Sequence, residues 1–148
     1  MAVVSKGFTL LELLVVISII GILMAIGSVS FSTAQKKGRD SRRQGDMTAI
    51  QKSLEEYYAL TNGYPASVTS GGSITYLTNT LMNLVPYDPK NSGTYVYTYT
   101  VDAPAVKTAY CLCALLENTG MGNANTVGAA GVCSFGGTRN YFCVSNQQ

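Results

Sequence analysis

The sequence contains no histidine and no tryptophan, and charged residues make up only 12% of it. Histidine is the commonest general base and metal ligand near neutral pH, so its absence argues against most hydrolase and zinc chemistry. A Ser-His-Asp triad is impossible in this chain. The net charge of +2 is too small to indicate nucleic acid or an acidic surface as the main partner. We therefore expect a protein that is not an enzyme and that uses no cofactor and no metal.

The few charges are also unevenly distributed along the chain. No charged residue occurs between Leu13 and Phe31. As a helix, residues 8–31 would be roughly 36 Å long at about 1.5 Å per residue, enough to cross a hydrocarbon core of about 30 Å. Gly21 and Gly27 would let another helix approach closely. We expect a helix over residues 8–34 that spans a membrane or forms the core of a filament.

One acidic residue interrupts the start of this apolar segment. Glu12 lies one turn into the segment, where insertion scales assign a carboxylate a cost of about 2.5–3.5 kcal/mol. A secretory signal peptide would also combine a basic residue with an apolar core, and it would be cleaved near residues 32–34. Such a signal does not predict an acid inside its core. Glu12 is therefore a functional candidate that needs a partner.

The residues around this acid form a recognisable motif. The pattern KGFTLLEL begins at Lys6, and Glu12 stands four residues after Phe8. It resembles the class III signal of type IV pilins and pseudopilins. The resemblance implies that a prepilin peptidase cleaves between Gly7 and Phe8 and methylates the new amine of Phe8. Residues 1–7 are then a leader that ends in Lys6 and Gly7.

Cleavage at this position has a chemical consequence for assembly. The amine of Phe8 would lie at the tip of an apolar helix, where Glu12 of a neighbouring copy can pair with it. Because each copy offers one donor and one acceptor, the pairing is head-to-tail and gives an open helical array. The resemblance thus implies four partners: other copies of the chain, prepilin peptidase, the pilus assembly machinery and, before assembly, the inner membrane. Family members often have a proline in this helix, whereas residues 27–30 read GSVS, which leaves open whether the helix melts.

An apolar helical pattern resumes beyond the span. Its residues recur at intervals of three and four: Met47, Ile50, Leu54 and Tyr57. This spacing predicts a helix face that packs on a sheet. In pilin-like proteins one continuous helix serves both parts, which implies a helix from about Phe8 to Leu60. We expect Gly63 to occupy the left-handed cap position and Pro65 to prevent continuation.

A basic run separates the two apolar stretches. It comprises Lys36, Lys37, Arg39, Arg42 and Arg43. We expect these side chains to contact the membrane edge or acids of neighbouring copies such as Asp46, Glu55 and Glu56. Nucleic acid binding is a weaker alternative, because no aromatic residues interleave with the charges. Charge counting alone would place this side of the span in the cytoplasm, but the cleavage motif and the cysteines favour the opposite topology.

The remaining sequence indicates a small β-rich head. Alternation predicts a strand over Tyr95–Val101, and two more are expected over Ala109–Leu116 and Asn140–Val144. Residues 35–148 would then hold the outer half of the helix and the head. The fold class is α+β, with the long N-terminal helix packed on an antiparallel meander as in the type IV pilin fold. The tyrosines are expected to pack across strands, and Asp88 to form an Asx-turn rather than a calcium site.

Four cysteines lie in this head: Cys111, Cys113, Cys133 and Cys143. An even number in an exported region predicts two disulfides. A tetrathiolate zinc site is the alternative, but the Cys-x-Cys spacing is tighter than that of ordinary zinc ligands. We expect one cysteine of the pair 111 and 113 to bond Cys143 and the other to bond Cys133. These bonds would close the flexible loop over residues 117–137.

The leading functional interpretation is a structural subunit of an extracellular type IV pilus-like filament. The alternative within the same family is a pseudopilin of type II secretion or of DNA uptake. A conventionally secreted binding module is a third possibility, and it would begin at Gln35 after signal cleavage.

Overall fold

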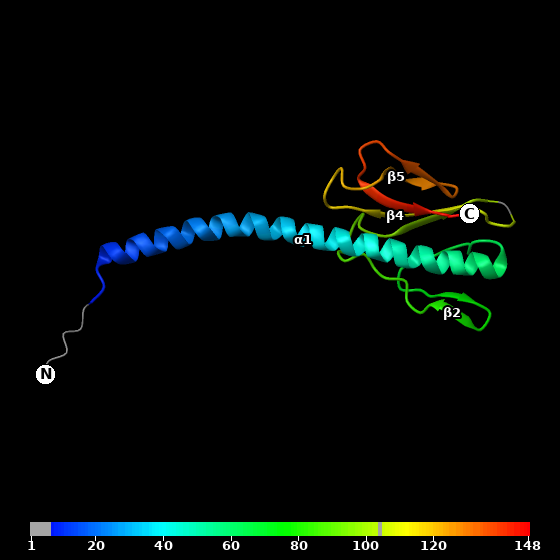
Figure 1. Ribbon diagram of the computed structural model, residues 1–148, viewed down its shortest axis with the longest axis horizontal. Helices are drawn as coiled ribbons and strands as arrows, with labels where there is room; N and C mark the ends of the chain where they lie inside the picture. Colours follow the sequence, from blue (N-terminus) through cyan, green and yellow to red (C-terminus); the bar gives the residue numbers. More distant parts are fainter. Residues whose placement is uncertain (1–6, 104) are drawn as a thin grey trace. The chain divides into compact units, whose positions relative to one another are not determined.

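Figure 1 shows the computed structural model of the chain, which describes residues 7–103 and 105–148. The chain divides into two compact units, Met1–Gln35 and Lys36–Gln148. Helix α1 runs from Leu10 to Thr61 and contributes residues to both units. Its ends lie within two residues of those expected, which confirms the long N-terminal helix.

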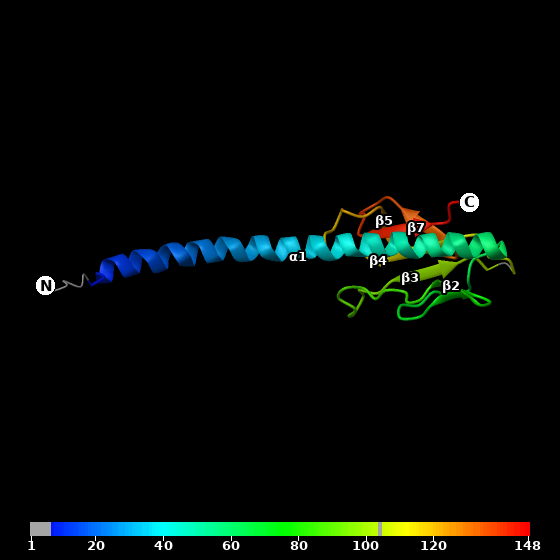
Figure 2. The ribbon, with the colours of Figure 1, turned by 60° about the horizontal axis from the view of Figure 1, so that its bottom comes forward.

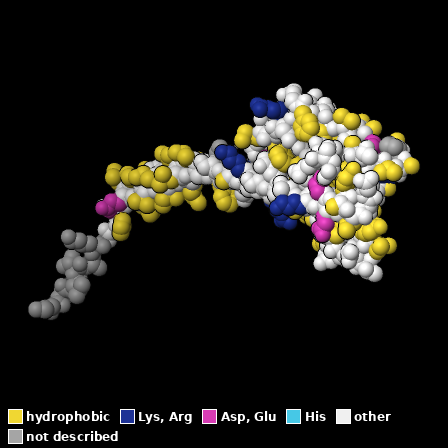
Figure 3. All heavy atoms as spheres, turned by 45° about the vertical axis from the view of Figure 1, so that its right-hand side comes forward, with side chains coloured by type: hydrophobic (Ala, Val, Ile, Leu, Met, Phe, Trp, Pro, Cys, Tyr) yellow, Lys and Arg dark blue, Asp and Glu magenta, His cyan; other side chains and the backbone are white. Residues whose placement is uncertain are grey.

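The described part of the first unit consists mainly of the apolar segment of α1. Leu10 is 85% exposed, and the side chains described up to Gln35 are all exposed. Figure 3 shows hydrophobic side chains covering this segment. A helix that is apolar on every side needs an apolar environment. Among the described residues, α1 is the one helix long and apolar enough to cross a membrane, a test that signal sequences also pass.

The second unit contains two antiparallel sheets beside α1 (Figures 1 and 2). The two-stranded sheet consists of β1 (Ile74–Tyr76) and β2 (Asn79–Met82). The five-stranded sheet has the order β3-β4-β7-β5-β6. Its strands are β3 (Thr98–Val101), β4 (Tyr110–Leu115), β5 (Ala124–Ala129), β6 (Val132–Phe135) and β7 (Tyr141–Ser145).

The strand predictions were only partly correct. The two strands expected near residues 109–116 and 140–144 are β4 and β7. The strand expected from Tyr95 is shorter, because the N–H groups of Tyr95 and Val96 donate to the carbonyls of Ser92 and Thr94 in a turn. The three predicted strands lie side by side and antiparallel in the expected order, β3-β4-β7, but β5 and β6 come between β4 and β7 in sequence and extend the sheet beyond β7. The segment interpreted as a flexible loop contains β5 and β6, and β1 and β2 were not predicted either.

The C-terminal end of α1 also differs from the expectation. Asn62 has the left-handed conformation, with φ of 56°, and its N–H donates to the carbonyl of Tyr58. Gly63 is not among the residues with positive φ. Asparagine tolerates this conformation because its short polar side chain bonds locally. The cap is therefore Asn62, one residue earlier than predicted.

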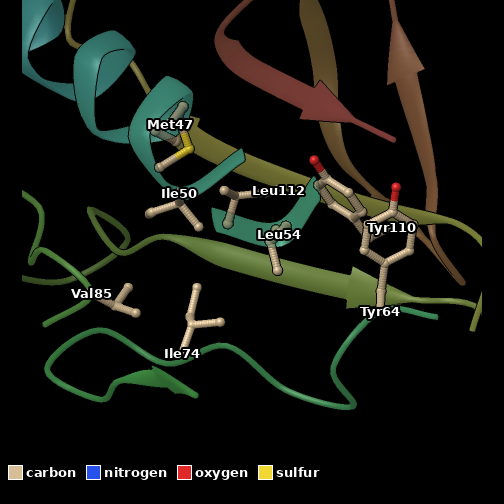
Figure 4. Packing of buried hydrophobic residues seen from close by; sticks show 9 residues of the cluster. Met47, Ile50, Leu54, Tyr64, Ile74, Val85, Tyr110 and Leu112 are labelled. Carbon is tan, nitrogen blue, oxygen red and sulfur yellow. The ribbon is translucent and has the colours of Figure 1, made fainter. Parts of the chain in front are cut away.

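The core of the second unit lies between α1 and the sheets (Figure 4). Met47, Ile50 and Leu54 are fully buried on one face of α1, which confirms the predicted stripe. Tyr110, Leu112 and Ala114 of β4 meet them from the five-stranded sheet, and Tyr64, Ile74 and Val85 complete the cluster. The rings of Tyr99 and Tyr110 stack at 5.9 Å, as expected for tyrosines packed across neighbouring strands.

This core yields the first testable prediction. Replacing Leu54 by alanine should leave a cavity and lower the free energy of unfolding by about 2–5 kcal/mol. The measurement is urea unfolding of the full chain in detergent, followed by tyrosine fluorescence. Leu60→Ala is the matched control, because Leu60 lies on the same helix but is 46% exposed. Equal losses in the two variants would contradict the assigned core.

Candidate functional site

The residues singled out at the N-terminus of α1 form a reciprocal helix cap. Thr9 precedes the first helical residue, and its carbonyl accepts the N–H of Leu13 at 3.2 Å. The Thr9 hydroxyl accepts the N–H of Glu12 at 3.2 Å. In return, Glu12 Oε2 accepts the Thr9 N–H and the Thr9 hydroxyl, each at 2.9 Å. This is a capping box, in which a threonine and a glutamate three residues later satisfy each other's free N–H groups.

The cap explains how Glu12 is tolerated at the start of an apolar helix. Glu12 was expected to act in assembly, and its local bonds were missed, although the spacing Thr-x-x-Glu predicts them. An ionised carboxylate has two oxygens and about four lone-pair sites. The cap occupies Oε2, so the carboxylate retains capacity to accept a further N–H donor.

The expected cleavage position lies directly before this cap. Gly7 and Phe8 precede α1, and Phe8 is 85% exposed. A Cβ added at Gly7 would meet no atom within 4 Å. Lys6 lies outside the described residues.

A second polar cluster, in the other unit, surrounds Arg43. This side chain is fully buried, and its guanidinium forms a two-pronged ion pair with Asp88 at 2.6 and 2.8 Å. Arg43 Nη1 also donates to Asp40 at 2.7 Å and to Glu117 at 3.1 Å. The face of Tyr95 lies 5.0 Å from the guanidinium carbon. We call Arg39, Asp40, Arg43, Asp88 and Glu117 the Arg43 cluster.

The cluster joins three separate segments of the second unit. Asp40 and Arg43 come from α1, Asp88 from the loop before β3, and Glu117 from the chain just beyond β4. Arg39 adds a second two-pronged pair to Glu117 at 2.6 and 2.7 Å. Asp40 in turn accepts the backbone N–H groups of Glu117 and Asn118 at 2.9 and 3.0 Å. Buried charges are tolerated where each is paired and hydrogen-bonded in this way.

These contacts correct the interpretation of the basic run. Arg43 is fully buried and paired with Asp88, so it is not accessible to lipid headgroups, neighbouring copies or nucleic acid. Arg39 pairs with Glu117 but keeps a third of its side chain exposed. Arg42 is exposed and lies 3.9 Å from Asp46, one turn further along the helix. Lys36 and Lys37 are exposed. Alternation of charge sign along the helix, with Asp40 between Arg39 and Arg43, was the signal that could have indicated intramolecular pairs.

The cluster shifts the pKa values of its acids. Hydrogen bonds from Arg39 lower the pKa of Glu117 to about 2, against an opposing effect of burial. Burial would raise the pKa of Asp88, but hydrogen bonds from Arg43 and from the Lys90 and Asn91 N–H groups outweigh it and lower the pKa. The bond from Lys90 is the Asx-turn expected at Asp88. Both acids are therefore stabilised as carboxylates.

A groove of about 610 Å³ lies beside the Arg43 cluster. It is lined by Lys37, Asp40, Ser41, Gln44, Glu117, Asn118, Thr119 and Met121. Both carboxylates are already paired with arginines, and Asp40 also accepts two backbone N–H groups.

The cysteines form two disulfides, Cys111–Cys133 and Cys113–Cys143. This agrees with the expectation that one of Cys111 and Cys113 bonds Cys133 and the other Cys143. The register of the sheet decides between the two remaining pairings, because Cys113 and Cys143 lie directly opposite each other on β4 and β7.

Comparison with known proteins supports the N-terminal site. Residues 4–28 match the family model described as the prokaryotic N-terminal methylation motif. No curated protein and no solved structure matches the chain. The matched segment is the class III prepilin signal of type IV pilins. The long N-terminal helix packed on antiparallel sheets, with two disulfides near the C-terminus, is a pilin-like α+β architecture that agrees with this signal.

The lowered pKa values predict acid sensitivity. Folded-state pKa values below the unfolded ones give stability that is present above about pH 4.5 and is lost as pH falls toward 2. We expect the urea midpoint of the full chain in detergent to fall over this window. Glu117→Gln should start less stable and lose less between pH 5 and pH 2. An unchanged pH profile in this variant would contradict the role of Glu117.

Removal of the central cation gives a stronger effect. Arg43→Met leaves buried carboxylates without their partner, which should lower the free energy of unfolding by about 3–5 kcal/mol. The neighbouring Arg42→Met is the matched control, because the Arg42 side chain is 64% exposed. The control should change stability by less than about 1 kcal/mol, as is usual for exposed pairs. Urea unfolding measures both, and similar values would refute the buried pair.

Proposed function

We propose that the protein is a structural subunit of a type IV pilus-like extracellular filament. A prepilin peptidase cleaves between Gly7 and Phe8 and methylates the amine of Phe8, and the trimmed subunits then assemble through their N-terminal helices. The observation that carries the proposal is a carboxylate in the first turn of an apolar helix, four residues after the cleavage position within the matched motif.

The physical basis of assembly is the pairing of two groups that are each unfavourable in an apolar environment. Cleavage creates an ammonium group at Phe8, and Glu12 supplies a carboxylate on the next copy. The capping box keeps Glu12 bonded to Thr9 within its own chain before a neighbour arrives. The partner's amine then completes the hydrogen bonds of a carboxylate that is already oriented at the helix end.

The apolar surface of the first unit supports the same function. Its exposed leucines and isoleucines suit the lipid around a membrane-anchored precursor. In a filament the same side chains pack against helices of neighbouring copies, where close approach is easiest at the glycines. One surface thereby serves both states, and the role is structural rather than catalytic.

The test separates charge pairing from helix capping. Glu12→Gln keeps a side chain that can complete a capping box but removes the charge that pairs with the amine. We expect mass spectrometry to show normal cleavage and N-methyl-Phe8, while the yield of sheared surface filaments falls at least about tenfold, consistent with a loss of about 3–5 kcal/mol per contact. Glu56→Gln is the control, because Glu56 is exposed and lies outside the apolar segment.

Other outcomes would overturn the proposal. Normal filament yield from Glu12→Gln would refute the pairing. A mature chain that begins at Gln35 would indicate conventional secretion. Loss of protein secretion or DNA uptake from cells that form no surface filament would identify a pseudopilin instead.

A further inference from the structure

The five-stranded sheet has a second buried layer that consists largely of sulfur. On β4, Tyr110, Leu112 and Ala114 belong to the core against α1, whereas Cys111 and Cys113 belong to a separate cluster. Alternate residues of a strand point to opposite faces, so the cysteines lie on the face away from α1. The buried members of this cluster are Cys111, Cys113, Ala124 and Cys143, with Val127, Cys133 and Tyr141 around them.

The hairpin that covers this face has few other attachments to the sheet. Strand β5 pairs with β7 at one register position, Ala124 with Tyr141, and irregularities interrupt the pairing of β5 with β6. Asn123 adds side-chain hydrogen bonds to the backbone of Cys143. The disulfide between Cys133 of β6 and Cys111 of β4 is therefore a main attachment of the β5–β6 hairpin to the rest of the sheet.

The sulfur atoms are arranged as a compact group and not as two distant pairs. All four Sγ atoms lie within 4.8 Å of one another. Cys111 and Cys113 belong to different disulfides, yet their Sγ atoms are only 3.4 Å apart. In a tetrahedral zinc site with Zn–S bonds of about 2.3 Å, neighbouring sulfurs lie about 3.8 Å apart. After reduction, the same backbone can bring four thiolates to this spacing through small side-chain movements.

We propose that the reduced chain binds one Zn²⁺ through Cys111, Cys113, Cys133 and Cys143, and that the ion then holds the β5–β6 hairpin in place of the disulfides. The tight Cys-x-Cys spacing is no obstacle, because the ligands come from three strands, β4, β6 and β7, whose pairing sets their positions. Small domains with little apolar core use disulfides or metals for the same purpose. This proposal is independent of filament assembly.

Two equivalents of a phosphine reduce the two disulfides to four thiols, each phosphine taking one oxygen atom from water. One Zn²⁺ then binds the four thiolates and releases four protons, so affinity should increase with pH.

The test uses the full chain in detergent, reduced with a phosphine and kept under anaerobic conditions. Titration with Co²⁺ should give thiolate-to-cobalt charge transfer and the visible bands of tetrahedral cobalt, saturating at one ion per chain. Zn²⁺ should displace the cobalt, and the oxidised chain should show no such bands. Hydrogen exchange of residues 124–135 should slow when Zn²⁺ is added to the reduced chain.

Two variants of β6 make the test specific. Cys133→Ser removes one ligand and should weaken cobalt binding by about tenfold or more. Even the loss of a residue that only hydrogen-bonds to a metal ligand lowers metal affinity by about 10–100-fold. Ser134→Ala is the matched control on the next, exposed residue and should leave affinity unchanged. The proposal fails if cobalt does not saturate at one per chain, if Cys133→Ser binds equally well, or if zinc leaves exchange in residues 124–135 unaltered.

Discussion

The buried guanidinium of Arg43 is the constraint on which the second unit depends. It joins α1 to the loop that carries Asp88 and to the chain beyond β4 that carries Glu117. A charge without access to water must find all its partners inside the protein, because a lost partner would leave an uncompensated charge. The pairs thus fix the rotation and the axial position of α1 against the sheet. The apolar stripe of Met47, Ile50 and Leu54 supplies burial, while the ion pairs connect α1 to the segments that carry Asp88 and Glu117.

One helix serves two different environments in this protein. Its first part is apolar on all sides and is capped by the reciprocal bonds of Thr9 and Glu12. Its second part is apolar on one face and bears paired charges elsewhere. The change from all-round to one-sided hydrophobicity coincides with the basic run, which the sequence alone made look like a surface for partners. Two of its arginines turned out to belong to the interior and its boundary.

The two faces of the five-stranded sheet also differ in the side chains that pack on them. The face toward α1 is filled by aromatic and aliphatic side chains, whose burial needs no covalent help. The opposite face is small, and cysteines replace the missing aliphatic core. Crosslinks there restrict the unfolded chain and add stability where burial is scarce. The same concentration of sulfur underlies the proposed metal binding of the reduced form.

The sequence predicted the long helix to within two residues at each end, the core stripe, the processing motif, strands β4 and β7 and the presence of two disulfides. These features follow from local periodicity, composition and short motifs. Such patterns depend on neighbouring residues and not on tertiary contacts. Four features became apparent only in the three-dimensional fold: the position of β7 between β4 and β5, the hairpin of β5 and β6, the disulfide pairing and the partners of Arg43. Each of these features joins residues that are distant in sequence, and local sequence patterns do not indicate which distant residues come into contact.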